Sequence, residues 1–247
     1  MSAKAPSLRL DRLLANLGYG SRREIEQMVR AGWIALDGAR VEAADRRVVV
    51  DPSLSARMTV RGQPLDPPPG FATLMLHKPL GVTCSHKEAG ALVYDLLPDR
   101  WRRRDPAIST IGRLDKDTSG LLLLTDDGAL LHRVISPKRH VPKQYEAVLD
   151  RPLKGDEAAI FAAGGLLLEG DDKPLLPAAM TALDERRARL TLTEGRYHQV
   201  RRMFAAVGNH VVALHRDRIG AMDLPDDLAP GQWRLMDAAA IAQVFAG

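Results

Sequence analysis

The chain has 247 residues, of which 45% are hydrophobic and 27% charged, which is the composition of an ordinary globular protein. No run of 18 or more apolar residues occurs, and the start of the chain lacks the apolar core of a secretory signal, so we expect no membrane association. Cys84 is the only cysteine, which excludes an internal disulfide, and we therefore expect a cytoplasmic protein.

The small net charge of +4 is unevenly distributed along the chain. Residues 1–62 contain 11 Lys and Arg against 7 Asp and Glu, and the remaining 24 basic and 24 acidic residues cancel. A compact basic segment beside a neutral one indicates a small module that binds a polyanion, since phosphate contacts supply most non-specific affinity for nucleic acids.

The basic segment predicts two short helices and a hairpin. Leucines between residues 10 and 17 follow helical spacing, and Gly18 ends that helix. Ser21 and Glu24 form a capping-box pattern at the start of a second helix, and Asp37-Gly38 is a two-residue hairpin signal. Five arginines project from the helices, and they indicate either a solvated face or, as we prefer, a face that contacts phosphates: Arg9, Arg12, Arg22, Arg23 and Arg30.

Residues 18–41, GYGSRREIEQMVRAGWIALDGARV, together with the leucine helix before them, resemble an RNA-binding domain of the S-four type, named for a ribosomal protein. The resemblance implies binding to structured RNA through the basic helical face. We place this domain at residues 8–61. The proline-rich stretch GQPLDPPPG at residues 62–70 is the predicted linker, because four prolines in nine residues cannot continue a helix or a central strand.

Residues 71–247 predict a larger α+β domain with a mixed or antiparallel sheet. Five apolar stretches predict strands, at residues 71–78, 120–125, 144–149, 189–193 and 210–215. Residues 197–207 and 237–246 predict helices. The irregular order of strands and helices argues against a regular doubly wound sheet.

The stretch IGRLDKDTSGLLLLTDDG at residues 111–128 places polar residues directly before four leucines. The leucines predict a short buried strand, and the turn before it carries Arg113, Asp115 and Asp117. Loops at the ends of buried strands often carry enzyme chemistry, although such residues can also simply solubilise a turn.

A second informative stretch is EGRYHQVRRMFAAVGNH at residues 194–210. On a helix, Val200 and Phe204 face the core, and Arg201 flanks that apolar stripe. Arg201 is therefore expected to lie half-buried and to need a carboxylate partner. Arg202 points away from the stripe and is expected to meet solvent or phosphate.

Residues 136–149, SPKRHVPKQYEAVL, carry a third cluster, with Lys138, Arg139 and Lys143 in the loop before Tyr145. A basic loop that leads into an aromatic residue suits a nucleotide base stacked on the ring, although the tyrosine could equally serve packing alone.

Phosphate-binding glycine loops are absent from the sequence. His77, Cys84 and His86 make a poor zinc ligand set. We therefore expect neither a metal nor an organic cofactor.

Three motifs resemble, in their order along the chain, the motif set of the pseudouridine synthases, in particular the RsuA/RluB branch. They are GRLDKDTSG (residues 112–120), KQY (143–145) and GRYHQVRRM (195–203). HKPLG, residues 77–81, is similar to that branch's leading motif, and other stretches look closest to the RsuA type, which modifies small-subunit ribosomal RNA. The resemblance implies Asp115 as the catalytic carboxylate, Arg201 as its ion-pair partner and Tyr145 as the residue that stacks on uracil. Arg113, Lys78 and Arg202 are implied as RNA contacts, and Asp117 is taken as a structural residue.

The resemblance implies isomerisation of uridine to pseudouridine in 16S ribosomal RNA, by a protein that we expect to be a monomer. The sequence leaves three different functions open: a large-subunit 23S enzyme of the RluB type, a non-catalytic RNA-binding protein of ribosome assembly, and a glycosidic-bond hydrolase that uses Asp115 with Asp117 or Asp126.

Overall fold

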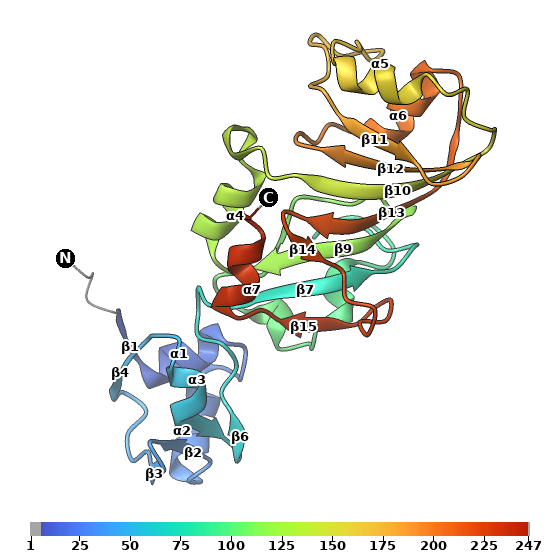
Figure 1. The fold of residues 1–247 in the computed structure, drawn as a ribbon. Coiled ribbons are helices and arrows are strands. Elements are labelled where there is room, and N and C mark those ends of the chain that lie inside the picture. Colours follow the sequence, from blue (N-terminus) through green and yellow to red (C-terminus); the bar gives the residue numbers. More distant parts are fainter. Residues whose placement is uncertain (1–5, 247) are drawn as a thin grey trace. The chain divides into compact units, whose positions relative to one another are not determined.

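The computed structural model describes residues 6–246, which divide into two compact units (Figure 1). The first unit contains the chain up to Leu74 together with Tyr94–Thr110 and Leu124–Leu131. The second contains Met75–Val93, Ile111–Leu123 and the chain from His132 onward. None of the helices within residues 6–246 has the length and apolar character needed to cross a membrane.

Residues 6–65 fold around their own apolar core, to which Leu10, Ile25 and Leu54 contribute fully buried side chains. The predicted capping box is confirmed, because the Ser21 and Glu24 side chains each accept a hydrogen bond from the other's backbone N–H. The elements of this region are β1 (Ser7–Arg9), α1 (Leu10–Asn16), α2 (Arg22–Arg30), β2 (Ile34–Leu36), β3 (Ala39–Arg40), β4 (Arg47–Val49), α3 (Leu54–Arg57), β5 (Met58–Val60) and β6 (Gln63–Pro64).

The predicted hairpin is also confirmed, since β2 and β3 are antiparallel and joined by Asp37-Gly38. Both turn residues have positive φ, 54° and 78°, as a two-residue hairpin turn of this kind requires. β2 also pairs with β5, giving a four-stranded sheet in the order β3-β2-β5-β6, and β1 pairs with β4.

The later strands form one mixed sheet in the order β11-β12-β10-β13-β9-β7-β15, with β14 on β13 and β8 on β9. β10 is antiparallel to both neighbours, whereas β13 is parallel to β9, so the expected α+β class with a mixed sheet is confirmed. The strands are β7 (Thr73–Lys78), β8 (Ser109–Ile111), β9 (Thr118–Thr125), β10 (Lys143–Leu149), β11 (Ala179–Ala182), β12 (Arg187–Leu192), β13 (Val211–Ile219), β14 (Met222–Asp223) and β15 (Trp233–Leu235).

The helices of this part are α4 (Gly128–Ile135), α5 (Glu157–Ala163), α6 (Gln199–Ala206) and α7 (Ala238–Gln243), with 3-10 turns at Val93–Leu96, Trp101–Arg103 and Pro137–Arg139. Figure 1 draws α5 and α6 together beside β11 and β12. Phe161 of α5 and Phe204 of α6 are both buried, with ring centroids 5.5 Å apart in an edge-to-face contact. This apolar layer fixes α6, whose first residues reach the candidate active site.

A buried ion pair joins the segment before β8 to the residue that follows β9. Arg104 Nη2 lies 2.7 Å from Asp126 Oδ2, and their side chains are 1% and 0% exposed. The other carboxylate oxygen of Asp126 accepts a hydrogen bond from the backbone N–H of Ala72. The charge of Arg104 is therefore neutralised inside the first compact unit.

Candidate active site

The turn between β8 and β9 presents Asp115 to solvent. All four leucines of residues 121–124 are buried, which confirms the predicted strand, and Leu114 anchors the turn from the other side. The backbone N–H of Thr118 donates to the Asp115 carbonyl, and the N–H of Gly81 donates to the Lys116 carbonyl. The Asp115 side chain is 32% exposed, so a fixed backbone carries a carboxylate that solvent can reach.

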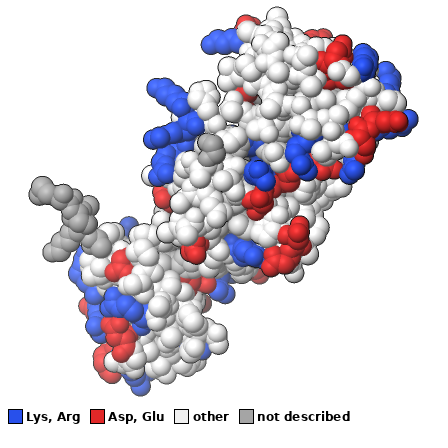
Figure 2. Space-filling view, in the orientation of Figure 1, with Lys and Arg blue, Asp and Glu red and all other residues white. Residues whose placement is uncertain are grey.

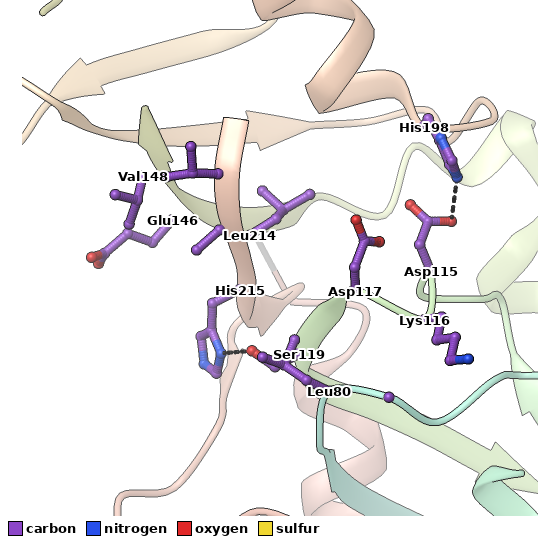
Figure 3. Close-up of a pocket in the computed structure, with 13 residues that line it drawn as sticks. Leu80, Asp115, Lys116, Asp117, Ser119, Glu146, Val148, His198, Leu214 and His215 are labelled. Carbon is purple, nitrogen blue, oxygen red and sulfur yellow. Dashed lines mark hydrogen bonds and ion pairs between the residues drawn. The ribbon is translucent and has the colours of Figure 1, made fainter. Parts of the chain in front are cut away.

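Two cavities in the second unit meet at Asp115 and His198. One, of about 690 Å³, is mostly apolar and lies along Leu80, Ser119 and Leu214 (Figure 3). The second, of about 540 Å³, contains Arg113, Tyr145 and Arg216 in its wall. Both volumes fall in the range of small-ligand sites in proteins.

His198 is a neighbour of Asp115 that we did not predict from the sequence. Its Nε2 lies 3.5 Å from Asp115 Oδ1, and Figure 3 shows the ring directed at the carboxylate. His198 precedes α6 and has a positive φ of 49°, which turns its side chain toward the Asp115 turn. Its ring stacks on Tyr197 with centroids 3.9 Å apart. The helix predicted at residues 197–207 included His198, whereas α6 begins at Gln199. A histidine within the motif GRYHQVRRM was the available signal.

The expected ion pair between Arg201 and Asp115 is wrong. Arg201 Nη2 lies 2.8 Å from Asp117 Oδ2, and the guanidinium also donates to the carbonyls of Val211 and Asp117. These two carbonyls hold the guanidinium at the Asp117 end of the turn. The half-buried position of Arg201 is confirmed, with 17% of its side chain exposed, and so is its need for a carboxylate. Asp117, taken as structural, also lines the apolar cavity.

Tyr145 lies opposite Arg216 in the pairing of β10 with β13, next to an irregularity in register at Gln144. Arg216 Nη1 donates to the Tyr145 hydroxyl at 3.3 Å, and its Nε donates to the Leu121 carbonyl at 2.8 Å. Lys143 lines the same cavity, and burial together with the Arg216 charge lowers the pKa of Lys143 to about 8. Arg216 was not predicted as a site residue, although it shares a strand face with Leu214.

Two side chains that we expected to contact RNA instead bind other groups of the protein. Lys78 is fully buried, and its ammonium donates to the carbonyls of Pro79 and Thr118, so it has no surface to offer RNA. Arg202 does not point into solvent either, because its guanidinium binds Asp171 and the Glu169 carbonyl. The sequence did not indicate these contacts, because Thr118 lies 40 residues from Lys78, and Glu169 and Asp171 lie 33 and 31 residues from Arg202.

The remaining basic candidates lie on the surface. Arg9 and Arg22 are exposed, and both bind the buried carboxylate of Asp11. Burial by itself would raise the pKa of Asp11, but the hydrogen bonds from the two arginines outweigh it and lower that pKa to about 2. The other side chains of this group are exposed: Arg12, Arg23, Arg30, Arg113, Lys138 and Arg139. In Figure 2, Lys and Arg side chains gather where Figure 1 draws the segment after α4.

Within residues 6–246, no group of three or more His, Cys, Asp or Glu side chains is arranged to hold a metal ion.

Two family models match the chain. The model described as RNA pseudouridylate synthase matches residues 72–206, which include the Asp115 turn, Tyr145 and α6. The model of the S4 domain matches residues 8–51, the region of α1 and α2.

Relatives of similar length are known from several bacteria. The chain is 40% identical to a ribosomal small subunit pseudouridine synthase A of Yersinia pestis, over 97% of this chain and 99% of that protein. It is 42% identical to an uncharacterized RNA pseudouridine synthase of Bacillus subtilis, over 92% and 94% of the two chains. A crystal structure of a pseudouridylate synthase is similar with a TM-score of 0.67 and 34% identity, covering 96% of this chain and 99% of that one.

Proposed function

Because the chain belongs to the RNA pseudouridylate synthase family, we propose that it isomerises uridine to pseudouridine at a site in small-subunit ribosomal RNA. The S4 domain and the relatives that modify ribosomal RNA support an RNA substrate. The choice of subunit rests on relatives named for the small subunit, among them the one of Escherichia coli, which is 39% identical over 96% of this chain.

The observation that carries the proposal is the presence of Asp115 and Tyr145 in the wall of one cavity of about 540 Å³. The reaction breaks the bond between ribose C1′ and uracil N1, turns the base, and joins C1′ to C5. It needs an extruded nucleotide, a carboxylate at the sugar and a surface that holds the base while it turns. An exposed carboxylate beside an aromatic ring supplies the last two.

In our proposal the Asp115 carboxylate acts on the ribose, either by adding to C1′ or by removing a proton from the sugar. Tyr145 stacks on the uracil, with its hydroxyl near C5. Arg201 acts through Asp117: by tying the exposed end of the turn to α6, it keeps the Asp115 backbone in place. His198 donates to the Asp115 carboxylate when its Nε2 carries a proton, which orients the oxygen 3.5 Å away.

The target RNA would bind along the exposed basic side chains. Arg113 stands at the cavity and Lys138 and Arg139 follow α4, so these three are the proposed phosphate contacts of the catalytic part. The exposed arginines of α1 and α2 are the proposed contacts of the S4 domain. We further propose that the protein is a cytoplasmic monomer that acts without a cofactor.

The test measures tritium release from 5-tritiated uridine in a small-subunit ribosomal RNA transcript, because the isomerisation frees the C5 hydrogen. We expect Asp115→Asn to bind RNA with unchanged affinity and to release no tritium. Near-normal turnover by this variant would remove Asp115 from the catalytic role. The same assay on a large-subunit transcript tests the choice of subunit, since faster release there would contradict it.

A binding protein and a hydrolase would each give a different outcome in these measurements. A non-catalytic ribosome-assembly protein would bind RNA and release no tritium. A glycosidic-bond hydrolase would release free uracil, and it would need a second carboxylate at a set separation from Asp115. The structure disfavours Asp126 for that role, since its carboxylate is buried against Arg104, and Asp117 is engaged by Arg201.

A further inference from the structure

Arg216 is a buried cation without a carboxylate partner among the described residues. Only 3% of it is exposed, and its hydrogen bonds go to the neutral Leu121 carbonyl and Tyr145 hydroxyl. Its Nη2 is buried and has no hydrogen-bond partner within residues 6–246. An unpaired charge held away from water is expensive, so a protein keeps one where a ligand supplies the opposite charge.

The acidic residues in the wall of the same cavity do not neutralise Arg216. They are Asp115, whose carboxylate lies 3.5 Å from His198 Nε2, and Glu194, whose carboxylate binds Arg196 and the Gln199 side chain. Lys143 adds a second half-buried cation to this wall, and among residues 6–246 its ammonium donates to the Val141 carbonyl alone. The wall of the cavity therefore carries positive charge at two buried or half-buried side chains, which suits an anion.

The proposed reaction generates such an anion. When the bond between C1′ and N1 breaks, its electron pair stays on the uracil and spreads over N1 and the carbonyl oxygens. The electron-poor ribose is met by the Asp115 carboxylate. C5 of the turned base then bonds to C1′, and any bond between C1′ and the carboxylate breaks at the same time. The C5 proton passes to water and N1 takes up a proton from water, so that pseudouridine and uridine have the same atoms.

We propose that Arg216 is a catalytic residue that stabilises the detached uracil anion through its guanidinium, with Lys143 as a second cation. This inference rests on the proposed function. The guanidinium carbon lies 5.8 Å from the centre of the Tyr145 ring and Nη1 donates to the Tyr145 hydroxyl, so the cation lies close to the place of a base stacked on that ring. The phosphates of the target nucleotide flank its ribose and stay near the surface, where Arg113 is exposed, so the buried guanidinium serves the base.

The position of Arg216 makes it effective in this role. A fixed cation in a site of low polarity interacts strongly with charge that develops during the reaction, and it needs no reorganisation. Removing one such donor slows a reaction by on the order of 100-fold to 1000-fold. The backbone hydrogen bond to Leu121, in the buried strand that follows the Asp115 turn, keeps the guanidinium at a set distance from that turn.

The experiment compares two leaving groups. Fluorine at C5 withdraws electrons and makes the uracil anion more stable, so 5-fluorouridine depends less on a stabilising cation than uridine does. Two transcripts are compared that differ only in carrying uridine or 5-fluorouridine at the target position. The measured quantity is the single-turnover rate at which the nucleoside with its base linked through N1 disappears. We expect Arg216→Gln to slow the uridine reaction by on the order of 100-fold and the fluorouridine reaction at least ten times less. The RNA dissociation constant should not change.

Two further variants complete the design. Arg218→Gln is the matched control, because Arg218 lies on the same strand, is exposed and pairs with Asp223, and both substrates should react at the normal rate. Arg216→Lys retains the charge and covers the case in which Arg216→Gln does not fold. It should slow both reactions less while still favouring fluorouridine.

Equal slowing on both substrates would overturn the inference and leave Arg216 as a support for Tyr145. A salt-dependent loss of RNA affinity at unchanged single-turnover rate would overturn it in favour of phosphate binding. Failure of the wild-type protein to convert uridine would instead refute the proposed function, and with it this inference.

Discussion

Breaking the buried pair of Arg104 and Asp126 should destabilise the first compact unit strongly. Asp126→Asn keeps the shape of the side chain but leaves the Arg104 guanidinium charged and buried. The Nε and Nη1 of Arg104 already have no hydrogen-bond partner among the described residues. In the variant, the neutral amide introduced at position 126 and the proline carbonyls bound by Nη2 would be the remaining polar neighbours of the guanidinium, and none of them neutralises its charge. Removing one partner of a buried pair costs about 3–5 kcal/mol in the free energy of unfolding. For a chain of this size, that corresponds to a fall in Tm of roughly 6–20 °C.

The measurement is urea unfolding at neutral pH, followed by circular dichroism. Asp99→Asn is the control, because Asp99 pairs with Arg102 at the surface and is 76% exposed, and such pairs contribute at most about 1 kcal/mol. The double variant Arg104→Met with Asp126→Asn should recover most of the lost stability, since it buries no unpaired charge. Equal losses in Asp126→Asn and Asp99→Asn would refute the reasoning.

Three further predictions concern other parts of the chain. Gly120→Ala should fail to fold or lose activity, because the added Cβ would lie 2.2 Å from the Arg216 carbonyl oxygen. Gly128→Ala is the control and should melt like the wild type, since its added Cβ would have no heavy atom within 4 Å. The pKa of Asp11, about 2, lies below its unfolded value near 4, so the stability that its charge adds is present above about pH 4. This contribution to stability should disappear as the pH falls to 2. A stability difference between the wild type and Asp11→Asn that does not shrink between pH 4 and pH 2 would contradict the role given to the Asp11 charge. Lys143, with a pKa of about 8, loses its charge as the pH rises through that value. Single-turnover rates should therefore fall above about pH 8 in the wild type but not in Lys143→Met. The same fall in both proteins would exclude Lys143 as its cause.

Local features could be predicted where a few neighbouring residues decide the conformation. The Ser21 cap and the Asp37-Gly38 turn follow from hydrogen bonds and φ angles that only nearby side chains control. The four leucines of residues 121–124 predicted a buried strand, because no other placement removes so much apolar surface from water. Helices α4 and α5 were missed, because a short apolar run does not by itself distinguish a helix from a strand.

The sequence by itself determined that a rigid, leucine-anchored turn presents Asp115 and that Arg201 lies half-buried beside the sheet. Only the tertiary structure decided that Arg201 binds Asp117, that His198 faces Asp115 and that Arg216 contacts the Tyr145 hydroxyl. Turns and apolar faces depend on the chain within a few residues. Ion partners depend on strand register and on how a helix is seated against a sheet, and those are set by the packing of side chains that lie far apart in the sequence.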